Sequence, residues 1–139
     1  MWSTALTGPE IAWMRGRKLD GQEPGLLRYY RFNHHGSVLR NSAGLLYYGD
    51  DTFGSPQTVE STAPILALGP GGALSFSSMA RYRVEVPHAA DLNAYPLAVT
   101  CWLHTTENDP VTRGIVTKYV DSSGNGYSMN LENGHVRAW

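Results

Sequence analysis

The fold is decided by three stretches: Gly71-Gly72-Ala73-Leu74-Ser75-Phe76, Tyr82-Arg83-Val84-Glu85-Val86-Pro87 and Leu97-Ala98-Val99-Thr100-Cys101-Trp102-Leu103-His104. In the second stretch apolar residues alternate with Arg83 and Glu85, as they do in a strand that has one face in the core. The third stretch predicts another strand, whose inner face consists of Leu97, Val99, Cys101 and Leu103. Together they predict two strands that face one core.

The composition favours a single all-β domain. The chain has 139 residues, and its 15 Gly, 8 Pro and 8 Tyr favour turns and strands. Its net charge of −1 gives no electrostatic reason to expect nucleic acid or a membrane surface as a partner. No signal peptide follows Met1 and no stretch approaches the ~20 apolar residues of a membrane span, so we expect a soluble chain without a leader.

A short helix is expected at about Pro9 to Leu19. Thr7-Gly8-Pro9-Glu10 combines a capping hydroxyl, a proline that the first turn allows and a glutamate at the third helical position. We expect Gly21 to end this helix and its apolar side to dock on another element.

The middle of the chain gives weaker signals. Leu26 to Phe32 predicts a strand, because it is rich in aromatic and β-preferring residues. The region from Ser37 to Ala63 is expected to be a long, loosely regular connection with Asp50-Asp51 as a turn dipeptide. Within it, Leu45 to Tyr48 and Thr58 to Glu60 are candidates for short strands.

The end of the chain predicts a strand over Thr112 to Val120, followed by a hairpin of Gly126 to Glu132 with His135 to Trp139. Asn133-Gly134 is the two-residue turn that best tolerates positive φ at both central positions. The alternation in the first hairpin strand places Tyr127, Met129 and Leu131 on one face, opposite Ser128 and Asn130.

The ordered series of these segments resembles the laminin-G-like, concanavalin A-like jelly-roll domains of bacterial multidomain surface and secreted proteins. The matching segments are Gly71 to Phe76, Val84 to Pro87, Leu97 to Trp102, Gly114 to Tyr119, Asn125 to Tyr127, and Asn133-Gly134. Upstream, Glu23 to Phe32 resembles the linker and first strand that open such a repeat, and Ala5 to Ile11 resembles the turn that closes the repeat before it.

The resemblance implies an all-β, partial jelly-roll sandwich of antiparallel strands with one short N-terminal helix. It divides the chain into a helix and linker (1–24), a first strand with a long irregular connection (25–68), and the N-terminal half of a sandwich (69–139). Family members continue with further strands, so we expect the chain to self-associate, or to rearrange its long connection, to cover the incomplete sandwich. The family is mostly extracellular or on the cell surface.

One loop has the spacing of a calcium site. The candidate ligands, with Gly126 at the turn, are Asp121, Ser123, Asn125 and Glu132. The flanking segments predict strands rather than the helices of an EF-hand, so a looser calcium site and an ordinary polar connection both stay open. No other cofactor is expected. Adjacent residues of an extended chain point to opposite faces, so a solvated turn is favoured over a metal site for His34-His35.

No catalytic motif is present in the sequence. Retaining glycosidases of this sandwich class need two closely spaced carboxylates on one strand face, and no such pair occurs. There is also no Gly-x-Ser-x-Gly, phosphate loop or paired Cys motif, and Cys101 alone is expected to be a small buried thiol.

Aromatic residues support a binding role instead, since flat rings with polar tips suit stacking on sugars. The candidates are Tyr47, Tyr48, Tyr95, Trp102 and Trp139, with core packing as the plainer alternative for each. We expect a non-catalytic glycan- or protein-binding module of a larger surface or secreted protein. The alternatives are a structural, self-associating segment without a ligand and a remote glycoside-hydrolase-like domain.

Overall fold

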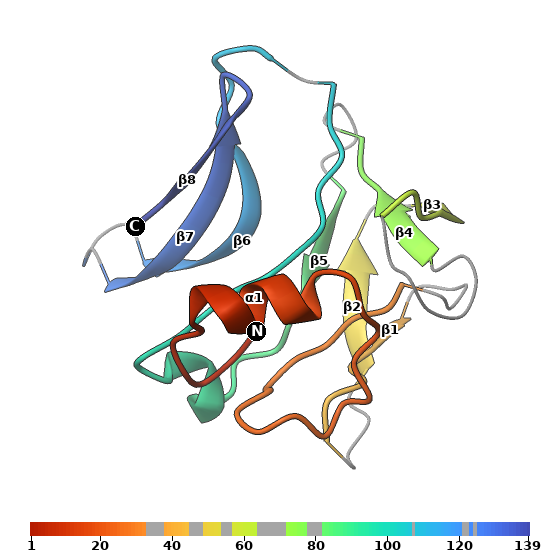
Figure 1. Cartoon of the computed structure of the whole chain (residues 1–139). Coiled ribbons are helices and arrows are strands. Elements are labelled where there is room, and N and C mark those ends of the chain that lie inside the picture. Colours follow the sequence, from red (N-terminus) through yellow and green to blue (C-terminus); the bar gives the residue numbers. More distant parts are fainter. Residues whose placement is uncertain are drawn as a thin grey trace. The chain divides into compact units, whose positions relative to one another are not determined.

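The computed structural model describes residues 1–32, 38–44, 49–53, 57–63, 72–77, 82–106, 108–120, 123 and 125–139. These residues form mostly strands in antiparallel sheets, with one short α-helix, which confirms the all-β class (Figure 1). The chain divides into two compact units, Met1–Cys101 and Trp102–Trp139, and each is described by itself. No helix in the described ranges combines the length and the apolar character of a membrane span.

Helix α1 spans Gly8–Met14, and its start is the predicted capping box. The Glu10 backbone N–H donates to Thr7 Oγ1 (3.4 Å), and the Thr7 N–H donates to Glu10 Oε2 (2.6 Å). The predicted extension to Leu19 is wrong, because the helix stops at Met14. Gly16 lies just beyond this end, where a glycine costs about 1 kcal/mol relative to alanine.

The expectation that α1 docks through an apolar side is also wrong. None of its residues is buried, and the Trp13 side chain is 53% exposed. The Arg17 guanidinium lies 4.7 Å from the centre of the Trp13 ring, a cation–π contact. Local contacts therefore stabilise this helix more than tertiary packing does.

The N-terminal unit holds two small antiparallel sheets and a 3-10 helix. One sheet has the order β1-β2-β5, and the other pairs β3 with β4. The bounds are β1 Val38–Arg40, β2 Gly49–Phe53, β3 Gln57–Glu60, β4 Gly72–Ser75, β5 Arg83–Glu85 and η1 Ala90–Asn93.

Several strand predictions in this unit are confirmed. Strands form within Thr58 to Glu60, Gly71 to Phe76 and Tyr82 to Val86. The predicted alternation also holds, since Val84 is half-buried between exposed Arg83 and Glu85. The candidate strand at Leu45 to Tyr48 lies outside the described residues, as does Gly71.

The predicted turn at Asp50-Asp51 is wrong. Both residues belong to β2, where Asp50 pairs with Leu39 and Asp51 pairs with Val38 on β1 and with Glu85 on β5. Aspartate and glycine have low β-propensity, but strand partners on both sides override that preference.

Leu26 to Phe32 and Leu97 to Leu103 do not form the predicted strands. Their backbone pairing consists of isolated bridges, among them those of the buried Trp2 with Leu26 and with Ala98. The inner face predicted for Leu97 to Leu103 is buried only in part. Leu97 and Val99 are half-buried, whereas Leu103 is exposed. Cys101 is exposed as well, so the expectation of a buried cysteine is wrong.

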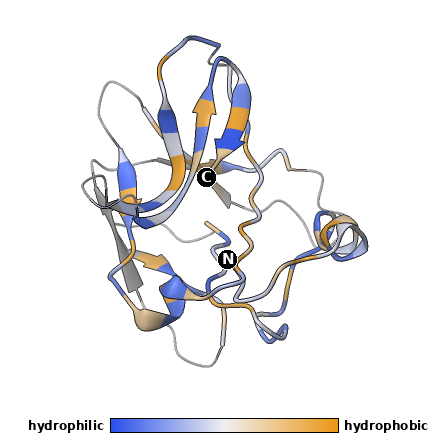
Figure 2. Ribbon diagram, turned by 90° about the vertical axis from the view of Figure 1, so that its left-hand side faces the viewer, coloured by the Kyte–Doolittle hydropathy of each residue, from blue (hydrophilic) through white to orange (hydrophobic). Residues whose placement is uncertain are grey.

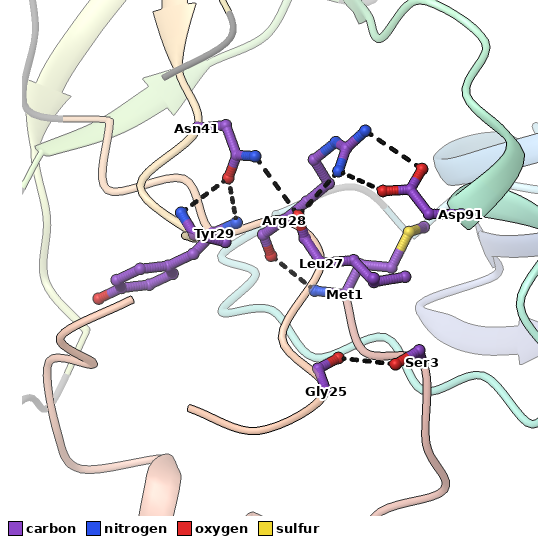
Figure 3. Close-up of polar contacts among 9 residues, drawn as sticks. Met1, Ser3, Gly25, Leu27, Arg28, Tyr29, Asn41 and Asp91 are labelled. Carbon is purple, nitrogen blue, oxygen red and sulfur yellow. Dashed lines mark hydrogen bonds and ion pairs between the residues drawn. The ribbon is translucent and has the colours of Figure 1, made fainter. Parts of the chain in front are cut away.

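A buried asparagine joins the loops of the N-terminal unit (Figure 3). Asn41 is 2% exposed, and its Oδ1 accepts hydrogen bonds from the backbone N–H groups of Tyr29 (2.9 Å) and Ala43 (3.0 Å). Its Nδ2 donates to the Leu27 carbonyl oxygen (3.4 Å). One side chain thereby satisfies three backbone groups that have no strand partner.

Contacts around Arg28 tie the start of the chain to η1 (Figure 3). Arg28 forms an ion pair with Asp91 of η1 (3.0 Å), and its carbonyl oxygen accepts a hydrogen bond from the Met1 amino group (2.9 Å). Burial lowers the pKa of that amino group to about 6. Ser3 Oγ donates to the Gly25 carbonyl oxygen beside these contacts (3.3 Å).

The C-terminal unit is a three-stranded antiparallel sheet in the order β6-β7-β8. The strands span Arg113–Val120, Asn125–Glu132 and His135–Ala138, which confirms the predicted strand and hairpin. Asn133 and Gly134 have φ values of 50° and 72°, the left-handed conformation on which the hairpin prediction rests. Asn133 N–H also donates to the Asp109 carbonyl oxygen (2.9 Å), which fixes the turn against the segment before β6.

Alternation along β7 is as predicted. Polar and apolar residues follow one another along the strands in Figure 2. Ser128 and Asn130 are nevertheless buried, while Tyr127 and Met129 on the other face are only half-buried. At these four residues the polar side of β7 is therefore more buried than its apolar side.

Candidate ligand-binding face

Two of the four predicted calcium ligands, Asn125 and Glu132, lie far apart. Asn125 and Glu132 are the first and last residues of β7, so the rise along a strand separates them by about 24 Å. Glu132 instead forms an ion pair with Arg137 (3.1 Å). Asp121 lies outside the described residues, and Ser123 is in the turn before β7. One ion cannot bind both Asn125 and Glu132.

No group of three or more His, Cys, Asp or Glu side chains in the described ranges could hold a metal ion. The pair His34-His35 lies outside those ranges.

The predicted aromatic ligands fall in different parts of the chain. Tyr95, which follows η1 in the N-terminal unit, is 96% exposed, and Trp102, at the start of the C-terminal unit, is 52% exposed. Trp139 is 63% exposed. Tyr47 and Tyr48 lie outside the described residues. No one unit contains both Tyr95 and Trp102.

The register of the C-terminal sheet brings a different set of side chains together. Thr117 of β6 pairs with Ser128 of β7, and Ser128 exchanges two backbone hydrogen bonds with Trp139 (2.9 and 3.1 Å). These three residues therefore form a row across the sheet, and residues two positions along share its face. We call this set the polar face; it consists of Thr117, Tyr119, Ser128, Asn130 and Trp139.

Hydrogen bonds order the hydroxyl groups of the polar face. Ser128 Oγ donates to Asn130 Oδ1 (3.1 Å), and the Oγ atoms of Thr117 and Ser128 lie 3.5 Å apart. Because a serine has one hydroxyl hydrogen, Thr117 is the donor of this long contact and keeps its lone pairs as acceptors. The Asn130 amide nitrogen has no acceptor among the residues that the structure describes.

The charged groups at the edge of the polar face are paired. Glu132 and Arg137 lie on the same side of the sheet as Asn130 and form the 3.1 Å ion pair. Their opposite charges offset each other. The polar face therefore presents neutral donors and acceptors.

Acidic side chains elsewhere are also held by arginines. Glu85 pairs with Arg83 (2.6 Å), and Arg113 holds Asp109 through two hydrogen bonds, one of 2.9 Å. The bonds from Arg113 lower the pKa of Asp109 from 3.8 to about 2. A general acid at neutral pH needs a raised pKa, so Asp109 is not suited to that role.

Although the Cys101 residue is exposed overall, partial desolvation of its thiol raises the pKa of that group. Since the thiolate is the nucleophile, this environment does not activate the cysteine.

Thr117 and Tyr119 are the members of the polar face that sequence reasoning did not single out; Tyr119 is the aromatic one. It is 40% exposed and lies two residues from Thr117 on β6. The predicted strand already contained part of the signal, because period-two alternation places Thr117 and Tyr119 on one face of β6.

Comparison with protein-family models, with curated proteins and with solved structures finds no match to this chain.

Proposed function

We propose that the chain is a non-catalytic binding module that recognises a neutral glycan on the polar face of its C-terminal unit. The supporting observation is that the exposed Thr117 hydroxyl lies on the same face as two exposed aromatic rings, Tyr119 and Trp139. A sugar ring has an apolar face for stacking and hydroxyl groups around its edge, which this combination matches.

The spacing of the strands gives room for such a ligand. Tyr119 is on β6 and Trp139 directly follows β8, on either side of β7 and two residues out of line, so their backbones are about 12 Å apart. Gly126 of β7 pairs with Tyr119 and carries no side chain. Gly126 has a φ of 127°, and an added Cβ there would lie 1.9 Å from the Lys118 carbonyl oxygen, so the close approach of β6 requires glycine at this position.

We extend the proposal to the fold and its context. The antiparallel sheets and the hairpin register support a partial concanavalin A-like jelly-roll sandwich. In that interpretation the chain is part of a larger surface or secreted protein. A glycan is favoured over a protein ligand because the polar face is neutral and its charged neighbours are already paired.

The glycoside-hydrolase alternative has less support. Glu85, Asp91, Asp109 and Glu132 each pair with an arginine. For Asp109, the hydrogen bonds from Arg113 lower the pKa to about 2, whereas a catalytic acid must hold its proton near neutral pH.

Glycan-array binding by the intact chain tests the proposal. We expect Trp139→Ala to weaken binding about tenfold, because an aromatic contact is worth about 1.4 kcal/mol. Tyr119→Ala should act in the same direction. Trp13→Ala is the matched control, since Trp13 is similarly exposed but belongs to α1. It should leave binding unchanged.

Two outcomes contradict the proposal. One is a wild-type chain that binds no glycan on the array. The other is a loss caused by Trp102→Ala without any loss from Trp139→Ala, which would assign binding to a different aromatic candidate, outside the polar face.

A further inference from the structure

Among the residues that the structure describes, strand β8 lies at an edge of the C-terminal sheet. Within the ranges that the structure describes, it pairs with β7 alone. All four of its residues, His135 to Ala138, are exposed. An open edge carries unpaired backbone donors and acceptors, and another extended strand can use them.

The hairpin register shows which backbone groups point outward. Ser128 and Trp139 exchange bonds in both directions, so they form a hydrogen-bonded pair. Such pairs alternate along an antiparallel ladder, so Arg137 with Asn130 is also one. The N–H and C=O groups of Val136 and Ala138 therefore face away from β7.

We propose that two copies of this chain pair through β8, antiparallel, about a two-fold axis at Arg137. In this register Val136 of one copy lies opposite Ala138 of the other, and the outward N–H and C=O groups of these residues bond to each other. The two copies then form one continuous sheet through an interface that uses the same residues on both sides.

In this register the side chains of β8 in one copy are complementary to those of β8 in the other copy. Val136 meets Ala138 on the apolar face, and His135 meets Trp139 on the polar face. Pairs of these kinds stabilise neighbouring strands. The two Arg137 side chains lie opposite each other, but each already has Glu132 at 3.1 Å, so positive and negative charges alternate across the axis.

These matches favour a second copy over an unrelated strand. An occupant of this edge needs apolar residues two positions apart and a compensated charge between them. β8 itself supplies both. The proposal does not depend on glycan binding, although such a dimer would place the two polar faces on the same side of one sheet, where they could bind a repeating ligand together.

A proline at position 138 tests the pairing selectively. Ala138→Pro removes an outward N–H that β7 does not use, and proline is tolerated on edge strands. Ala138→Val is the matched control, because it keeps the N–H and the strand preference. Sedimentation equilibrium should give the wild type and the Ala138→Val variant twice the 15.3 kDa mass of one chain.

By symmetry, Ala138→Pro removes one donor from each copy. At about 1 kcal/mol for each bond, we expect the dimer to dissociate roughly 30-fold more easily. Amide hydrogen exchange of the wild type gives a second measurement that needs no variant. The amides of Val136 and Ala138 should exchange more slowly as protein concentration rises, while the Arg137 amide, already bonded to β7, should not change.

A wild-type chain that stays monomeric at high concentration overturns the proposal. So does a dimer that Ala138→Pro leaves intact, or a dimer in which the amides of Val136 and Ala138 exchange as fast as in the monomer. Either of the last two results would assign the contact to another surface, such as the apolar face of the sheet.

Discussion

Replacing Asn41 with alanine should strongly destabilise the N-terminal unit. The Asn41 side chain makes three hydrogen bonds to backbone groups, and its removal leaves the N–H groups of Tyr29 and Ala43 without an acceptor. A buried donor left unsatisfied costs about 1–3 kcal/mol. We therefore expect Asn41→Ala to lower the free energy of unfolding by about 3 kcal/mol, a large share of the 5–15 kcal/mol typical of a domain.

Two measurements check this expectation. Urea unfolding gives the change in stability, and amide hydrogen exchange should show faster exchange at Tyr29 and Ala43 in the variant. Asn125→Ala is a control for the chemical change, because Asn125 is exposed. An Asn41→Ala variant no less stable than the Asn125→Ala variant would refute the idea that this one side chain holds the loops together.

Gly21→Ala should destabilise the chain by more than about 1 kcal/mol, because Gly21 has a φ of 92° and an added Cβ would lie 1.9 Å from the Ser42 carbonyl oxygen. Gly8→Ala has open space around it and should raise the melting temperature slightly, so equal shifts for the two variants would contradict this reasoning. The depressed pKa of Asp109 makes its ion pair a source of stability above pH 3.8, which is lost as the pH falls towards about 2. An NMR titration should place this carboxyl near 2 in the wild type and closer to 3.8 after Arg113→Gln; a wild-type value near 3.8 would count against the pair.

Local chemistry made the ends of the chain predictable. The capping box of α1 depends on Thr7 and Glu10, three residues apart, and the β7–β8 hairpin depends on Asn133-Gly134. In both cases the residues that set the geometry are neighbours in the sequence. The polar face was partly predictable for the same reason, because the hairpin register places Ser128 and Asn130 opposite the apolar residues of β7.

Long-range pairing explains the errors. Asp50-Asp51 has turn chemistry but lies in β2, because β1 and β5 pair with it from both sides. Leu97 to Leu103 has strand chemistry, yet its backbone pairs with Trp2 through an isolated bridge at Ala98 and forms no strand. Neither partner is visible from the local sequence.

The calcium prediction was based on linear spacing alone. The interval from Asn125 to Glu132 matches a compact ion-binding loop, but this segment is an extended strand. The same number of residues therefore separates the two side chains instead of bringing them together. Spacing in the sequence does not reveal whether the connecting backbone is a compact loop or an extended strand, and this difference sets the distance between Asn125 and Glu132.

Trp2 differs from the other three tryptophans in its surroundings, and the difference has a spectroscopic consequence. Trp2 is enclosed between Leu26 and Ala98, whereas Trp13, Trp102 and Trp139 are each more than half exposed. Acrylamide should therefore quench the emission of three indoles and spare the fourth, which would emit at shorter wavelength. The protein thus contains its own fluorescent reporter, and red-shifting of that protected component would signal the opening of the N-terminal core without any attached dye.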